Sequence, residues 1–135
     1  MEARSNSPGA RVLVVEDEEA MTEVFTETLE RLGIVVVAES DPRRVLESFK
    51  NGEHYDVVVL DLRLPYVCGL ALLEQIRRDH PDLPVIVVTG YPSTESVQRC
   101  RELGVLHYMR KPFEPEELSR QVRRALSPPR SAAPA

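Results

Sequence analysis

The chain of 135 residues has no tryptophan, two cysteines and only two lysines among its 17 lysine and arginine residues. The cysteines, Cys68 and Cys100, form neither a metal-binding spacing nor a disulfide framework. Cys100 falls on an apolar helix face and is predicted to lie in the core, whereas Cys68 falls in a loop. A disulfide-stabilised scaffold and a cysteine-based metal site are therefore both excluded.

Long apolar runs are also missing from the sequence. None approaches the roughly 20 residues that a membrane-spanning helix requires, and the polar segment Met1–Ala10 lacks the apolar core of a secretory signal. The net charge of −5 argues against a general nucleic-acid surface, because phosphate binding requires a basic face. We therefore expect a cytoplasmic protein without a membrane partner and without direct nucleic-acid binding.

What the chain does contain is 42% hydrophobic and 29% charged residues, in a length suited to one domain. Four short apolar runs stand out: Val12–Val15, Val57–Leu60, Val85–Val88 and Tyr108–Met109. Continuous, β-branched runs of this kind are typical of strands that are buried on both faces of a parallel sheet.

Predicted strands and amphipathic helices alternate along the chain. The predicted strands are Arg11–Asp17, Ile34–Ala38, Asp56–Leu60, Val85–Thr89 and Leu106–Met109. The predicted helices are Glu19–Leu32 (with Val24, Phe25 and Leu29 in its apolar stripe), one that begins at Asp41-Pro42, one that buries Leu70, Leu73 and Ile76, the polar Ser93–Leu103, and Pro115–Leu126. This alternation predicts an α/β fold, a doubly wound five-stranded parallel sheet with helices on both faces.

The strand order follows from where polar residues lie. The predicted strand Ile34–Ala38 is followed by no reactive group comparable to those that follow the other four strands. An edge position explains this difference, and it predicts the order 2-1-3-4-5 with the switch point between the first and third strands.

The two ends of the chain differ in composition from the domain between them. Residues 1–10 contain Ser, Asn, Pro and Gly and are predicted to be a disordered leader. Residues 127–135, mostly Ser, Pro and Ala, are predicted to be a disordered tail or linker. The folded domain is predicted to span residues 11–126.

Charged and hydroxyl side chains follow four of the predicted strands. Glu16-Asp17, Asp61, Thr89 and Lys111 each come directly after a different apolar run or at its end. Because parallel strands end at the same edge of a sheet, and ligands bind in the crevice at that edge, we expect these side chains to share one pocket.

The chemistry of such a pocket can be argued from its residue types. Three carboxylates repel one another unless a cation neutralises them, and oxygen ligands without His or Cys favour Mg²⁺ or Ca²⁺ over zinc. Asp17 and Asp61 are predicted to be direct Mg²⁺ ligands, with Glu16 acting through water. A carboxylate can also attack phosphorus to form an acyl phosphate, whose charge Mg²⁺, Lys111 and Thr89 would stabilise. The pattern predicts phosphoryl transfer to Asp61.

The chain resembles the receiver domains of two-component response regulators over about Arg11 to Leu126. The matching motifs are Val14-Val15-Glu16-Asp17, Asp61-Leu62-Arg63-Leu64-Pro65, Gly69, Thr89-Gly90 and Tyr108-Met109-Arg110-Lys111-Pro112-Phe113. Each motif is weak alone, but their order and their positions at strand ends make the combination specific.

The resemblance implies that Asp61 accepts a phosphoryl group from a sensor histidine kinase or a phosphotransfer protein. It implies Mg²⁺ bound by Asp17, Asp61 and the main-chain carbonyl of Arg63, with Glu16 acting through water. It also implies that Lys111 contacts the phosphoryl group and forms a cis peptide bond with Pro112. The chain is predicted to be a phosphoacceptor signalling domain that catalyses only its own phosphorylation and dephosphorylation.

The resemblance further implies a conformational switch formed by Thr89 and Tyr108. We expect activation to reshape the face formed by the predicted helix at Ser93–Leu103, the strand after it and the helix Pro115–Leu126, and this face is also a possible homodimer interface. Arg63 and Tyr91 occupy variable places beside the phosphoryl site, which leaves the lifetime of the phosphorylated state open.

Two alternative functions were weighed against this interpretation. A phosphatase of the haloacid dehalogenase type requires a second Asp two residues after its nucleophile, and here that position is Arg63. A degenerate receiver that acts as a constitutive interaction module is disfavoured because all acceptor residues are present. The sequence leaves open the cognate kinase, the output, and whether the domain acts alone or within a longer regulator.

Overall fold

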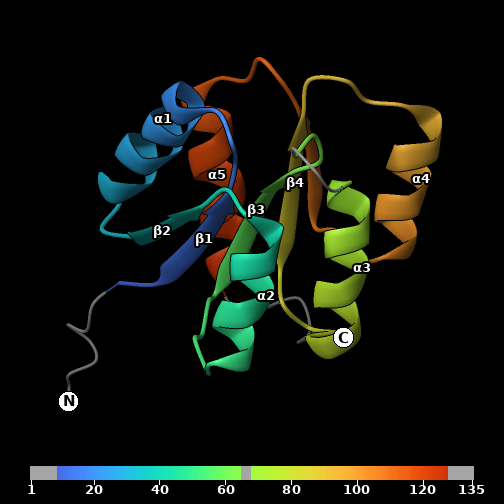
Figure 1. Ribbon diagram of the computed structural model, residues 1–135. Helices are drawn as coiled ribbons and strands as arrows, with labels where there is room; N and C mark the ends of the chain where they lie inside the picture. Colours follow the sequence, from blue (N-terminus) through green and yellow to red (C-terminus); the bar gives the residue numbers. More distant parts are fainter. Residues whose placement is uncertain (1–8, 65–67, 128–135) are drawn as a thin grey trace, which may run out of the picture.

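The computed structural model describes residues 9–64 and 68–127, in which five parallel strands alternate with five helices (Figure 1). The strands are β1 (Arg11–Val15), β2 (Val35–Glu39), β3 (Val57–Asp61), β4 (Val85–Thr89) and β5 (His107–Arg110). The helices are α1 (Glu19–Glu30), α2 (Pro42–Lys50), α3 (Gly69–Asp79), α4 (Thr94–Glu102) and α5 (Pro115–Leu126). The sheet order is β2-β1-β3-β4-β5, so the predicted fold class and strand order are confirmed.

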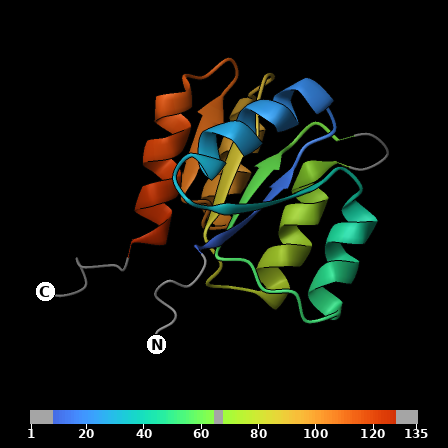
Figure 2. The ribbon, with the colours of Figure 1, turned by 90° about the vertical axis from the view of Figure 1, so that its left-hand side faces the viewer.

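The sheet separates two apolar cores because successive strand side chains point to opposite faces. In β1, Leu13 and Val15 belong to the core under α2, α3 and α4, whereas Val12 and Val14 belong to the core under α1 and α5. Figures 1 and 2 show these two helical layers on opposite faces of the sheet. The three central strands are buried on both faces, which explains their unbroken apolar runs.

The strand β2 lies at one edge of the sheet and pairs only with β1 among the described strands. Its exposure follows from this position, since Val35 is 42% exposed although the same residue type is buried throughout the central strands. The edge assignment made from the missing polar residues is therefore confirmed.

Several helix ends form as their sequences predict. The Asp41 side chain accepts a hydrogen bond from the backbone N–H of Arg43 at 2.9 Å, and Pro42 opens α2. The first helix is shorter than predicted, because it ends at Glu30 rather than Leu32 before Gly33 turns the chain with a φ of 80°. Placing Val24 in the buried stripe was wrong, since it is 39% exposed while Phe25 and Leu29 fill the core.

The predicted leader and tail fall largely on residues 1–8 and 128–135, which lie outside the described residues, as does Pro65 of the predicted motif. Within residues 9–64 and 68–127, no helix has the length and the apolar character needed to cross a membrane.

Candidate functional site

Three carboxylates meet at the carboxyl edge of the sheet. Glu16 and Asp17 follow β1, Asp61 ends β3, and the two strands pair side by side up to Val15 and Leu60. One oxygen of each carboxylate lies within 4.8 Å of the other two. Glu16 and Asp61 are only 3% and 4% exposed, whereas Asp17 faces solvent. The cluster is therefore half-buried, with Asp17 at its open side.

Lys111 lies between the two buried carboxylates. Its Nζ is 3.1 Å from Glu16 Oε1 and 3.2 Å from Asp61 Oδ2, and its side chain is 15% exposed. The residue follows β5, two strands away from β3, and its backbone N–H donates to the Thr89 carbonyl at 2.8 Å. The Lys111-Pro112 peptide bond is cis, as the resemblance implied.

The charges of the cluster do not balance. Burial raises the pKa of Glu16 to about 7, and the neighbouring Asp61 charge adds to the rise, which Lys111 and a bond from the Glu18 N–H only partly oppose. Burial alone would lower the pKa of Lys111, but Asp61 and Glu16 outweigh it and the net shift is upward. One ammonium thus faces three carboxylates, an excess of negative charge that a hard divalent cation would neutralise. The donor set fits such an ion, since it consists of oxygens only.

Thr89 is the buried hydroxyl of the same edge. It ends β4, is 1% exposed, and its Oγ1 accepts a hydrogen bond from the Tyr91 N–H at 3.1 Å. Among the described residues it forms no hydrogen bond to Asp61. In this conformation the hydroxyl therefore holds the start of the segment between β4 and α4.

Tyr108, the other member of the predicted switch pair, lies in β5 beside Val87 of β4. Its hydroxyl is 2.8 Å from Ser96 Oγ in the first turn of α4, in a partly buried contact. Ser96 was not predicted as a functional residue. The Ser93-x-x-Ser96 spacing could have indicated its capping role, but no pattern in the sequence indicates its contact with a residue of β5.

The backbone and the side chain of Arg63 make separate contacts near the site. Its backbone N–H donates to Asp61 Oδ1 at 2.9 Å, and its guanidinium lies 4.3 Å from the centroid of the Tyr91 ring. The sequence placed Arg63 and Tyr91 beside the site but did not predict that they stack. This cation–π pair joins the segment after β3 to the segment after β4.

Gly69 allows the start of α3 to approach the end of β3. A Cβ at this position would lie 2.6 Å from Leu62 Cα and 2.9 Å from the Asp61 carbonyl oxygen. The Gly69 N–H donates to the Leu62 carbonyl at 3.0 Å. The backbone that directly follows Asp61 is thus held by a contact that only a glycine permits.

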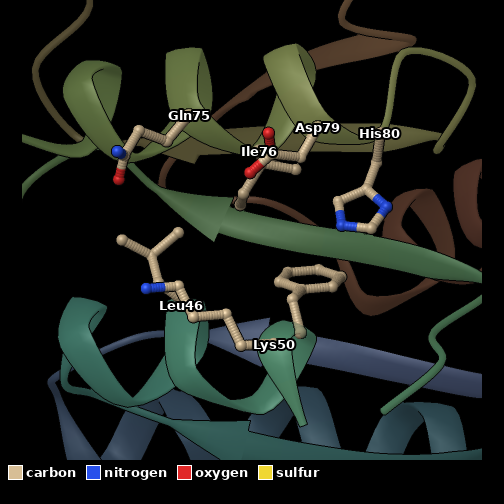
Figure 3. A pocket seen from close by; sticks show the side chains of 7 residues that line it. Leu46, Lys50, Gln75, Ile76, Asp79 and His80 are labelled. Carbon is tan, nitrogen blue, oxygen red and sulfur yellow. The ribbon is translucent and has the colours of Figure 1, made fainter. Parts of the chain in front are cut away.

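Two hollows of the described surface lie away from the carboxylate cluster. One of about 280 Å³ opens between the C-terminal halves of α2 and α3, with Leu46, Phe49 and Ile76 as its apolar lining (Figure 3). An adjoining one of about 420 Å³ shares Phe49, Asp79 and His80. Both lie where the chain enters β3 and β4, at the edge of the sheet opposite the carboxylates.

Comparisons with known proteins agree with this geometry. The sequence matches the family model of the response regulator receiver domain over residues 12–123. It is 33% identical over 124 residues to the alkaline phosphatase synthesis transcriptional regulatory protein PhoP of Bacillus subtilis, covering 92% of this chain and 51% of that protein. The chain spans about half or less of the length of the curated relatives it matches, 48% and 24% in two further cases.

Solved structures of similar size align over most of the chain. The non-phosphorylated HemR receiver domain of Leptospira biflexa aligns with a TM-score of 0.81 and 32% identity, covering 89% of this chain and 96% of that one. The BeF3-activated DrrB receiver domain aligns with a TM-score of 0.77 and 32% identity, covering 87% and 97%. The chain belongs to the receiver domains of two-component response regulators, and its acidic cluster is consistent with the phospho-aspartate site of that family.

Proposed function

We propose that the domain accepts a phosphoryl group on Asp61, from a sensor histidine kinase or a phosphotransfer protein, in a reaction that requires Mg²⁺. The observation that carries this proposal is the position of the Lys111 ammonium, which lies 3.1–3.2 Å from both buried carboxylates. A nucleophilic carboxylate, a cation and a hydroxyl at one strand edge are the groups that phosphoryl transfer requires.

Each residue has a role that its position supports. Asp17 and Asp61, with the main-chain carbonyl of Arg63, hold Mg²⁺, and Glu16 contributes through a bound water. Mg²⁺, when bound, neutralises charge on the transferred phosphoryl oxygens. Lys111 exchanges its contact with Asp61 for one with the phosphoryl group, and Thr89 donates its hydroxyl to another phosphoryl oxygen. Asp61 is the nucleophile: its carboxylate oxygen forms a bond to phosphorus while the P–N bond to the donor histidine breaks and the imidazole leaves. No other group of the cluster forms a covalent bond.

Phosphorylation then changes the surface formed by α4, β5 and α5. Thr89 lies on β4, the strand next to β5. The movement of its hydroxyl toward the phosphoryl group therefore changes the surroundings of Tyr108. This surface is the one through which we expect partners, or a second copy of the chain, to sense the phosphorylated state. The domain itself acts as a cytoplasmic signalling module and not as an enzyme on external substrates.

The test is phosphorylation by acetyl phosphate with Mg²⁺, followed by intact mass and peptide mapping. The wild type should gain one phosphoryl group, and Asp61→Asn should gain none. Asp79→Asn makes the same chemical change at the opposite edge of the sheet, and it should behave as the wild type. Equal modification of Asp61→Asn, or of the wild type in EDTA, would show that Asp61 is not the Mg²⁺-dependent acceptor.

A further inference from the structure

The C-terminal end of α4 is tied to α3 by two arginines. The Arg77 guanidinium donates to the carbonyls of Leu103 at 2.7 Å and Gly104 at 3.4 Å, directly after α4. The same guanidinium donates to carbonyls after α3, namely His80 and Pro81 at 3.0 Å and Leu83 at 2.7 Å. Arg99 of α4 adds an ion pair with Glu74 of α3 at 3.0 Å. This end of α4 is therefore held at several points.

The N-terminal end of α4 depends on a smaller set of contacts. Ser93 and Ser96 form a reciprocal capping box, in which each side chain accepts from the other residue's backbone N–H. The contact of Ser96 with Tyr108, at 2.8 Å, is a side-chain bond from this end of the helix to the sheet. The first turn is thus joined to β5 through one hydroxyl pair.

The Ser96 hydroxyl is the atom that these contacts share. Its oxygen accepts from the Ser93 N–H at 3.2 Å and lies 3.1 Å from the Ser93 carbonyl oxygen. It also lies 2.8 Å from the Tyr108 hydroxyl, and either hydroxyl can donate in that bond. One oxygen atom of Ser96 therefore takes part both in the helix cap and in the contact with Tyr108.

The segment between β4 and α4 is also anchored at its start, next to β4. The Tyr91 N–H is bound to Thr89 Oγ1, the hydroxyl that phosphorylation would recruit. Residues 90–93 are thus held by Thr89 on one side and by the Ser96–Tyr108 pair on the other. If the Thr89 hydroxyl leaves the Tyr91 N–H, this segment loses one of its two anchors. The first turn of α4 can then move only if the Ser96–Tyr108 contact also breaks.

We propose that Ser96 is a positioning residue that latches the first turn of α4 to Tyr108 in the resting conformation, and that opening of this latch lets α4 swing about the end held by Arg77. The inference rests on the proposed function, because phosphorylation at Asp61 is the event that draws Thr89 away. The latch favours the resting state, so removing it should favour whatever binds the activated state.

The experiment measures the affinity of the domain for beryllofluoride with Mg²⁺, a phosphoryl mimic. Tyr108→Phe removes one hydroxyl and keeps the ring, and we expect it to bind beryllofluoride about two- to tenfold more tightly, the range that one hydrogen bond supplies. Ser96→Ala should give a similar gain. The double variant should gain no more than either single one, because both changes remove the same bond.

Ser93→Ala is the matched control, since it weakens the helix cap without removing either hydroxyl of the latch. The affinity of Ser93→Ala for beryllofluoride should stay within about twofold of the wild type. The reason is that the resting and activated conformations lose the same helix stability. Amide exchange on Tyr108→Phe should accelerate in residues 94–97 while residues 99–104, next to Arg77, stay protected.

The outcomes separate the latch from the proposed function. One outcome would overturn the latch alone. In it, the wild type binds beryllofluoride, Asp61→Asn does not, and Tyr108→Phe and Ser96→Ala bind with the affinity of the wild type. Additive gains in the double variant, or an equal gain in Ser93→Ala, would also overturn it, because they indicate general loosening of α4. Failure of the wild type to bind beryllofluoride would overturn the proposed function, and the latch with it.

Discussion

Arg63 and Tyr91 show how two residues far apart in the sequence can form one unit in the fold. Each follows a different strand, yet the guanidinium and the ring lie 4.3 Å apart beside the acceptor. A guanidinium stays protonated and cannot serve as a general base. The Tyr91 ring offers no carboxylate or amide that would orient a water molecule. We therefore expect the pair to shield the site without assisting hydrolysis.

We predict that the phosphorylated domain is comparatively long-lived and that loss of the stack shortens its lifetime. Arg63→Asn and Tyr91→Glu should each accelerate loss of phosphate by about two- to fivefold or more, since the stack of an exposed cation on a ring is worth roughly 0.5–1 kcal/mol. The measurement is the decay of the phosphorylated mass after the phosphodonor is removed.

Tyr91→Phe provides the control for this prediction, because it keeps the ring face under Arg63 and removes only the hydroxyl. Its decay should match the wild type. Unchanged or slower decay in Arg63→Asn and Tyr91→Glu would remove the shielding role.

At the scale of the elements, the start of α3 depends on the missing side chain of Gly69. The positions that a Cβ would contact are backbone atoms of Leu62 and Asp61, which cannot rotate away. The helix must then shift or the segment after β3 must bend, and both changes displace the acceptor carboxylate.

Gly69→Ala should therefore lower the free energy of unfolding by about 1–3 kcal/mol, the usual range for overpacking, and reduce phosphorylation by acetyl phosphate. Urea denaturation measures the first effect and intact mass the second. Gly90→Ala is the comparison, since its Cβ would meet only Lys111 Cβ at an ordinary 3.8 Å. Similar losses in both variants would show that crowding at Gly69 is not the cause.

The elements differ in how far their sequences predict them. The central strands and α5 were predicted closely, because buried β-branched runs and a Pro start leave few alternatives. Val24 was placed in the apolar stripe of the first helix because of its helical spacing, which gives the direction of a side chain but not how far it is covered. The Ser96–Tyr108 contact and the Arg77 bonds to the carbonyls of Leu103 and Gly104 join separate elements, so no local pattern predicts them.

The sequence predicted which residues gather at the site, but not how each one is buried. Glu16, Asp17, Asp61, Thr89 and Lys111 could be placed at one edge because a parallel sheet puts all strand ends together. The sequence could not predict that Asp17 is exposed while Glu16 is buried, since both residues follow the end of β1, where the regular alternation of side chains between the two faces stops. The roles of these residues in phosphoryl transfer stay predictions.

For the molecule as a whole, Mg²⁺ should act as a stabilising ligand of the folded state. The three carboxylates come from separate segments and meet only in the fold, so an ion that binds them favours folding over unfolding. Thermal unfolding should shift to higher temperature as Mg²⁺ is added and return when EDTA removes it.

Asp17→Asn should reduce that shift, because it removes a charged oxygen from the open side of the cluster. Without Mg²⁺ the variant should be at least as stable as the wild type, since one of three repelling charges is gone. A full Mg²⁺ shift in Asp17→Asn would exclude this carboxylate as a ligand.

The scarcity of lysine has a chemical consequence for the whole domain. Lys111 lies in the site and Lys50 is exposed at the end of α2, at the opposite edge of the sheet. Reagents that acylate amines spare guanidinium groups, so they leave nearly all of the positive charge in place. Acylation of Lys111 would remove the ammonium between Glu16 and Asp61, and Lys50 provides an internal reference for reagent access. In a protein so rich in arginine, one such modification would thus alter the proposed phosphoryl site and barely change the surface charge.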